Sequence, residues 1–191
     1  METIPILFIG YERAGKSSLC IRYVANIFSE DYDPIIEDCH RFTKEIDNNM
    51  YSLELLDTKG SEEYAMMQDS WIYFSKGFLI MFSLTSRKSF DIAVSCRQRI
   101  VKLLHGFEPK EIPMILVGNK VDLVNERQID TKEGEELAEK FGCKYFEIST
   151  KENINVAECL IELVRRIDGY YNINNAVDKQ DNNKIKEVNK K

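Results

Sequence analysis

The 191-residue sequence lacks the features of a secreted, membrane-spanning or nucleic-acid-binding protein. Its longest apolar run, GFLIMFSL at residues 77–84, is too short to cross a bilayer. The N-terminal METIPIL has no basic segment followed by a long apolar one, so we expect no secretory signal. A net charge of −6 argues against a nucleic-acid partner, because such partners are bound by basic patches.

Cysteine is sparse and irregularly placed. No two of the five cysteines form a CxxC pair. An odd number of scattered cysteines predicts reduced, cytosolic thiols rather than a disulfide framework or a zinc site. The five positions are Cys20, Cys39, Cys96, Cys143 and Cys159.

The composition that is present suits one soluble domain followed by a tail. Hydrophobic residues make up 43% of the chain and charged residues 30%, which is enough apolar material for one buried core. The last twenty residues, NINNAVDKQDNNKIKEVNKK, are rich in asparagine and lysine and poor in apolar side chains. We therefore expect residues 1–171 to form the domain and residues 172–191 to form a flexible tail.

Short apolar runs alternate with helical patterns along the domain. The runs at residues 4–10, 77–84, 112–119 and 144–150 predict buried strands, and residues 16–28, 89–105, 131–142 and 153–171 predict helices. Residues 40–46 and 51–57 flank Asp47, Asn48 and Asn49, which predicts a hairpin. Strands separated by helices form a mostly parallel sheet covered on both faces. We therefore predict an α/β fold with a six-stranded sheet and one antiparallel edge strand.

The segment GYERAGKSS, from Gly10 to Ser18, matches the phosphate-binding pattern GxxxxGK[ST] between a predicted strand and a predicted helix. Gly10 and Gly15 permit backbone angles that a Cβ would obstruct, so the loop N–H groups can point at phosphate oxygens. The Lys16 ammonium can reach the β- and γ-phosphates, and the Ser17 hydroxyl can ligate Mg²⁺. The alternative is a glycine loop with a chance lysine.

A second motif, VGNKVDL at residues 117–123, follows a predicted buried strand. Asp122 lies near the carboxyl end of that strand, where ligands bind in open α/β sheets. Its two carboxylate oxygens match the N1–H and N2–H₂ donors of guanine, whereas adenine has an acceptor at N1. NKVD alone could be a solvated turn, but its position after a phosphate loop favours a guanine reader. STK, at residues 149–151, could close over the base.

The segments GYERAGKSS, YDPIIED, DTKGSEEY, GNKVDL and STK have the order and spacing of small GTPases. Over residues 3–170 the chain resembles the Ras superfamily. YDPIIED and the lack of a tryptophan before Asp57 make it more similar to the Ras and Rap branch than to Rab or Rho proteins. The resemblance implies a P-loop small-GTPase fold and a signalling protein that binds GTP or GDP with Mg²⁺ and hydrolyses GTP.

The resemblance also implies roles for individual residues. Mg²⁺ would be held by Ser17 and, through water, by Asp57. Catalysis would involve Lys16, Lys59, Gly60 and Ser61. Phe28 would pack on guanine, with core packing as the alternative, and Tyr32 would close over the phosphates, with an exposed loop tyrosine as the alternative. The implied nucleotide contacts are Gly10, Arg13, Ala14, Gly15, Lys16, Ser17, Ser18, Phe28, Tyr32, Asp57, Gly60, Asn119, Lys120, Asp122, Leu123, Ser149, Thr150 and Lys151.

The same resemblance implies protein partners. Effectors and exchange factors would bind through two segments, from Tyr32 to Asp38 and from Lys59 to Asp69, and the family default is a monomer. No cysteine follows Cys159, and there is no MGxxx[ST] start, so we expect no lipid anchor and a cytoplasmic protein. Acidic residues among the lysines of the tail argue against a polybasic membrane anchor.

Four residues depart from the family pattern, and all four belong to the γ-phosphate region. Glu12 stands in place of glycine, Ile35 in place of threonine, Lys59 in place of alanine and Ser61 in place of glutamine. Ile35 has no hydroxyl for Mg²⁺, and Ser61 is too short to orient water as glutamine does. Glu12 would obstruct an arginine finger, which is worth roughly 10³–10⁵ in rate in the family. We therefore predict slow hydrolysis.

Three interpretations of these departures remain open. The first is a slow GTPase, in which Glu12 and Lys59 form an ion pair or Lys59 contacts the γ-phosphate; alternatively, both are merely exposed charges. The second is a hydrolysis-deficient pseudo-GTPase that acts as a permanently loaded scaffold. The third, a P-loop kinase or ATPase, is disfavoured by GNKVDL and STK.

Overall fold

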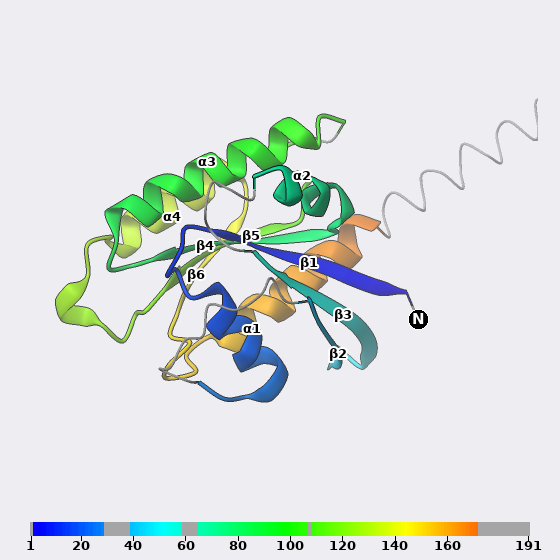
Figure 1. Cartoon of the computed structure of the whole chain (residues 1–191), viewed down its shortest axis with the longest axis horizontal. Helices are drawn as coiled ribbons and strands as arrows, with labels where there is room; N and C mark the ends of the chain where they lie inside the picture. The colour runs from blue at the N-terminus through cyan, green and yellow to red at the C-terminus, as the bar shows by residue number, and fades with distance from the viewer. Residues whose placement is uncertain (1, 29–38, 59–64, 107, 172–191) are drawn as a thin grey trace, which may run out of the picture.

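A computed structural model of the chain describes residues 2–28, 39–58, 65–106 and 108–171. Its centre is a six-stranded sheet in the order β2-β3-β1-β4-β5-β6 (Figure 1). Edge strand β2 pairs antiparallel with β3, and all other neighbours are parallel. The predicted sheet and its antiparallel edge strand are therefore confirmed. The strands are β1 (Thr3–Gly10), β2 (Cys39–Ile46), β3 (Asn49–Asp57), β4 (Gly77–Ser83), β5 (Met114–Asn119) and β6 (Lys144–Ile148).

Helices cover both faces of the sheet, as predicted. Side chains of α1 and of the helix at residues 156–171 belong to the hydrophobic core on one face. Side chains of α2, α3 and α4 belong to the core on the other face, and Figure 1 shows these three helices on the side opposite α1. The labelled helices are α1 (Lys16–Ala25), α2 (Ala65–Phe74), α3 (Arg87–Leu103) and α4 (Thr131–Phe141), with a short 3₁₀ helix, η2 (Val124–Glu126).

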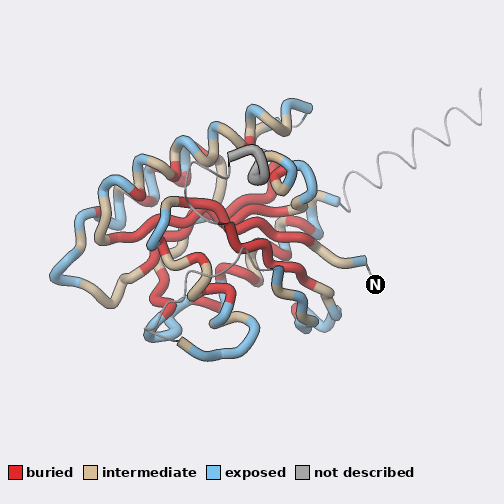
Figure 2. Tube along the Cα trace, in the orientation of Figure 1, coloured by how far each residue is buried: buried red, intermediate tan, exposed pale blue. Residues whose placement is uncertain are grey.

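The central strands are apolar throughout because each is buried on both sides. In β1, Ile6 and Phe8 face the core under α1, whereas Leu7 and Ile9 face the opposite core. Strands β4 and β5 alternate in the same way between the two cores. Figure 2 shows the result as a buried centre enclosed by exposed helix surfaces. Two-sided burial explains why these strands read as continuous apolar runs rather than as alternating patterns.

The hairpin and the helix ends are set by residues in the left-handed region. Asp47 and Asn48 have φ values of 52° and 63° and form the turn between β2 and β3. Strand β3 begins at Asn49, which is two residues earlier than expected. Gly142, with φ 72°, ends α4 as predicted, and Asn26, with φ 54°, ends α1 before the expected boundary.

Helix α2 was not predicted from the sequence. Ile72 is fully buried, yet Tyr73 and Phe74 next to it are 59% and 61% exposed. Apolar side chains on both sides of a helix give no contrast with a period of 3.6 residues, so the pattern carried no helical signal. The predicted tail at residues 172–191 lies outside the described residues. Among the helices that the structure describes, none is long and apolar enough to cross a membrane.

Candidate nucleotide site

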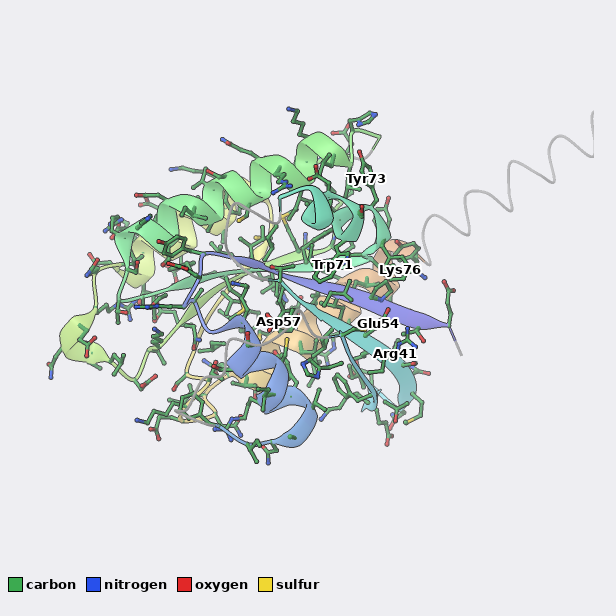
Figure 3. The ribbon with its side chains drawn as sticks, viewed as in Figure 1. Arg41, Glu54, Asp57, Trp71, Tyr73 and Lys76 are labelled. Atoms are coloured by element: carbon green, nitrogen blue, oxygen red, sulfur yellow. The ribbon has the colours of Figure 1, made fainter. Side chains whose placement is uncertain are left out.

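The sequence motifs meet at the carboxyl ends of the parallel strands. The phosphate loop connects β1 to α1, Asp57 is the last residue of β3, and Asn119 is the last residue of β5. Ser149 follows directly after β6. Figure 3 shows Asp57 beside α1. This edge of the sheet is where open α/β proteins bind ligands.

Lys16 lies folded across the phosphate loop. Its side chain is largely buried, and Nζ donates hydrogen bonds to the carbonyl oxygens of Gly10 and Tyr11, each at 3.1 Å. Burial lowers the pKa of the Lys16 ammonium, and the carboxylate of Asp57 opposes that shift. The structure thus holds a cation at the centre of the loop, with carbonyl partners that a phosphate could replace.

Two glycines allow the loop to pack directly on the sheet. Gly15 has φ 93°, and a Cβ there would lie 2.2 Å from Nδ2 of Asn119. Gly10 has φ 153°, and a Cβ there would lie 2.0 Å from the carbonyl oxygen of Met81 in β4. Neither position tolerates a side chain, which is the physical reason that the motif requires glycine at both.

Asn119 joins the phosphate loop to the base-side loop, which comprises residues 149–151. Its Nδ2 donates to the carbonyl oxygen of Ala14 at 3.0 Å. Its Oδ1 accepts from the backbone N–H and the hydroxyl of Thr150, at 3.2 and 3.1 Å, and from the N–H of Lys120 at 2.8 Å. The Asn119 side chain is buried, so these bonds are shielded from water.

Ser149 closes the base-side loop through hydrogen bonds to two residues just beyond it, Glu152 and Ile154. Ser149 and Ile154 exchange two backbone hydrogen bonds, at 3.2 and 3.0 Å. The Ser149 hydroxyl accepts from the N–H of Glu152 at 2.9 Å. Thr150 is buried, whereas Lys151 is exposed. In the loop after β5, Asp122 and Leu123 are half-buried, and a half-buried carboxylate can accept two hydrogen bonds from a base.

Phe28 follows α1 and is half-buried. Among the described residues, it is not one of those that pack in either hydrophobic core. Arg13 and Ser18 flank the buried part of the phosphate loop, and Arg13 has φ 60°. The structure thus brings the described nucleotide-site residues to one edge of the sheet, and their roles remain predictions.

The donor set fits Mg²⁺. Ser17 lies in the first turn of α1, and Asp57 is 6% exposed at the end of β3. Both offer oxygen, which Mg²⁺ prefers, and Mg²⁺ usually keeps waters and phosphates as its remaining ligands. Among the described residues, no group of three or more His, Cys, Asp or Glu could hold a metal ion.

The predicted catalytic residues are only partly described. Tyr32, Lys59, Gly60 and Ser61 lie outside the described residues, as does Ile35. Glu12 is described and is exposed in the phosphate loop. Its pairing with Lys59 therefore stays a prediction.

Two residues near the site carried no functional signal in the sequence. Tyr11 occupies a variable position of the motif, and Nζ of Lys88 in α3 lies 4.7 Å from the centre of its ring. Arg22 on α1 donates hydrogen bonds to the base-side loop, 128 positions away along the chain. The presence of an aromatic residue at a variable position of the motif could have indicated a packing role for Tyr11. No local pattern could have pointed to Arg22, because its partners are backbone carbonyls.

Comparisons with known proteins agree with this geometry. The model of the Ras family matches residues 5–169. A curated relative, the "Ras-like protein rasX" of Dictyostelium discoideum, is 36% identical over 186 residues, which cover 97% of this chain and 86% of the relative. The match therefore spans the phosphate loop, the base motif and the helices that carry them, and the chain belongs to the Ras family.

Proposed function

We propose that this protein is a guanine-nucleotide switch in intracellular signalling that binds GTP and GDP with Mg²⁺ and hydrolyses GTP slowly. Ras-family proteins bind GTP, and membership of this family implies GTPase activity in general. The observation that best supports binding in this chain is Asn119, whose buried amide holds Ala14 of the phosphate loop and Thr150 of the base-side loop.

The proposed contacts follow from the chemistry of the described groups. The loop N–H groups and Lys16 would hold the phosphates, because the N-terminus of α1 favours anions. Ser17 and Asp57 would hold Mg²⁺. Asp122 would accept hydrogen bonds from guanine and leave an acceptor unpaired against adenine. We therefore expect GDP to compete far better than ADP, and IDP, which lacks the 2-amino group, to bind more weakly than GDP.

Slow hydrolysis follows from the residues around the γ-phosphate. Ser61 lacks the reach to orient a water molecule, and Ile35 lacks the hydroxyl that would ligate Mg²⁺. Glu12 adds a carboxylate close to a triphosphate, where it would obstruct an arginine finger. Lys59 could partly compensate by contacting the γ-phosphate. We propose that intrinsic hydrolysis persists at a low rate and that arginine-finger activators stimulate it poorly.

The test is single-turnover phosphate release from protein loaded with GTP and Mg²⁺. We expect slow but measurable release, a faster rate in Ser61→Gln and a slower rate in Lys59→Ala. Ser95→Gln, on the exposed surface of α3, is the matched control and should release phosphate like the unmodified chain. Failure of the protein to load GTP at all would refute both the switch and the slow GTPase.

A second candidate is a pseudo-GTPase scaffold that holds one nucleotide permanently. The altered γ-phosphate residues favour it, and the intact metal ligands Ser17 and Asp57 count against it. Stable GTP loading with no phosphate release over hours, in the unmodified chain and in Ser61→Gln alike, would select the scaffold. We further propose that effectors and exchange factors bind at residues 32–38 and 59–69.

A further inference from the structure

Arg22 on α1 connects this helix to the base-side loop. Its Nε donates to the carbonyl oxygen of Thr150 at 3.0 Å, and Nη2 donates to that of Lys151 at 2.9 Å. Its Nη1 donates to the carbonyl oxygen of Asn26, at the end of α1, at 3.1 Å. One guanidinium therefore bonds two consecutive carbonyls of the loop and one carbonyl of its own helix end, and the planar group is suited to this use.

The Thr150 residue is held from both sides. Asn119 accepts from its N–H and its hydroxyl, and Arg22 donates to its carbonyl oxygen. Neither partner is near Thr150 in the sequence, so the loop cannot set this geometry by itself. Removing Arg22 would release the carbonyl side of Thr150 while Asn119 kept the amide side.

A neighbouring residue fixes the same helix to the segment beyond the loop. The hydroxyl of Tyr23 donates to the carbonyl oxygen of Val156 at 2.7 Å and lies 2.8 Å from Sγ of Cys159. Both partners belong to the helix at residues 156–171, which follows the base-side loop. Because Tyr23 anchors α1 to this helix, removal of Arg22 should free the loop without displacing α1.

Helix α1 begins at Lys16, so the same helix that carries the phosphate ligands also carries Arg22. We propose that Arg22 is a positioning residue that sets the rate of guanine-nucleotide dissociation by holding the base-side loop against α1. This inference rests on the proposed guanine-nucleotide site. Arg22 contacts neither the phosphate loop nor residues 57–58 in any hydrogen bond that we observe among the described residues, so its loss should leave the γ-phosphate chemistry unchanged.

The experiment compares dissociation of mant-GDP from the full chain and from Arg22→Ala, after addition of excess GDP with Mg²⁺. Loss of two hydrogen bonds from a charged donor should accelerate dissociation about tenfold. Arg22→Lys keeps a charged donor that can satisfy one carbonyl at a time. Its dissociation rate should fall between those of the unmodified chain and Arg22→Ala. Single-turnover phosphate release from loaded GTP should stay within about twofold in all three proteins.

Arg165→Ala is the matched control. Arg165 makes a two-point bond to Asp47, at 2.7 and 2.6 Å, and this pair lies between the helix at residues 156–171 and the β2–β3 turn. Dissociation from this variant should match the unmodified chain, whereas a purely structural role for Arg22 would make the two variants behave alike.

The outcomes separate the inference from the proposed function. Equal dissociation rates in the unmodified chain and Arg22→Ala would overturn the inference alone, as would parallel changes in dissociation and hydrolysis. If Arg22→Ala does not fold, Arg22→Lys and Arg22→Gln decide in its place, and dissociation at the unmodified rate in both would overturn the inference. If the unmodified chain takes up no mant-GDP, the proposed function fails and the inference fails with it.

Discussion

Gly15 of the phosphate loop lies directly against Asn119 at the end of β5. A Cβ on Gly15 would stand 2.2 Å from Nδ2 of Asn119, the atom that donates to the carbonyl oxygen of Ala14. Gly15 also has φ 93°, a conformation that L side chains rarely adopt. One glycine therefore allows both the loop conformation and the hydrogen bond that ties the loop to the base side of the site.

The first prediction concerns this contact. Gly15→Ala should weaken GDP binding at least about 100-fold, because the new methyl group must displace the Asn119 amide from Ala14 and strain the backbone. Isothermal titration with GDP and Mg²⁺ measures the effect. Gly169→Ala is the control, since Gly169 lies in the helix at residues 156–171 and a Cβ there meets no atom within 4 Å. Unchanged GDP affinity in Gly15→Ala would contradict the site described above.

Most strands could be predicted because burial on both faces of the sheet gives each of them a continuous local run of apolar residues. Residues 4–10 were expected as a strand and form all but the first residue of β1, since burial on both faces leaves an uninterrupted apolar run. Helix α2 gave no such signal, because Tyr73 and Phe74 expose aromatic rings where a polar face was expected. Local apolar pattern thus predicts elements where solvent and core separate cleanly and fails where they do not.

The site was predictable only where a motif fixes the backbone. Gly10, Gly15 and Lys16 follow from a spacing that a phosphate requires. The hydrogen bond from Arg22 to Thr150 and the cation–π contact of Lys88 with Tyr11 join distant segments, so they depend on the finished fold. These contacts stabilise the motif loops, but the sequences of the loops alone do not predict them.

The second prediction concerns Tyr11. Lys88 lies over its ring at 4.7 Å, and the Tyr11 carbonyl oxygen accepts from Lys16 at 3.1 Å. A cation–π contact at such a site is worth about 0.5–1 kcal/mol, so Tyr11→Ala should raise the Kd for GDP about two- to fivefold. Fluorescence titration with mant-GDP measures this. Tyr11→Phe keeps the ring and should bind like the unmodified chain.

A double-mutant cycle tests the mechanism of that effect. Lys88→Gln should weaken GDP binding about as much as Tyr11→Ala, and the double variant should be no weaker than either single variant. Strictly additive losses would mean that the two side chains act independently of each other.

The third prediction concerns the ion pair between Arg127, which follows η2, and Glu147 on β6. Arg127 makes a two-point bond to Glu147, with Nη1 to Oε2 at 2.9 Å, and Tyr145 donates to Oε1 at 3.0 Å. The side chains of Arg127 and Glu147 are only 24% and 16% exposed. Arg127→Met leaves the Glu147 charge half-buried with only the hydroxyl donors of Tyr145 and Thr131, so it should lower the free energy of unfolding by about 2–3 kcal/mol.

Chemical denaturation of the nucleotide-loaded protein measures that loss. Arg165→Ala breaks a pair of similar geometry whose side chains are 53% and 54% exposed, and it should cost clearly less because water screens the charges. Equal losses in the two variants would show that burial does not decide the strength of these pairs.

The fourth prediction concerns the pH dependence of stability through Glu54 on β3. Glu54 is 4% exposed and lies opposite Arg41 across the hairpin (Figure 3). Its Oε1 accepts from Sγ of Cys39 at 3.0 Å and from Nε of Arg41 at 2.5 Å. These two donors, the thiol first, lower the pKa of the Glu54 carboxyl, although burial acts in the opposite direction. Burial raises the pKa of the Cys39 thiol to about 11, so the thiol keeps its proton and donates at neutral pH.

Because the pKa of Glu54 is lower in the folded than in the unfolded state, its ionised form stabilises the fold above the unfolded pKa. That stabilisation is lost as pH falls through the lowered pKa of the folded state. Urea unfolding between about pH 7 and pH 3 should therefore show a shallower fall in stability for Glu54→Gln than for the unmodified chain. Cys39→Ala removes only the thiol donor and should give an intermediate slope. If Glu54→Gln ran parallel to the unmodified chain over this range, the hydrogen bonds from Cys39 and Arg41 would not be what holds this carboxylate in its ionised form.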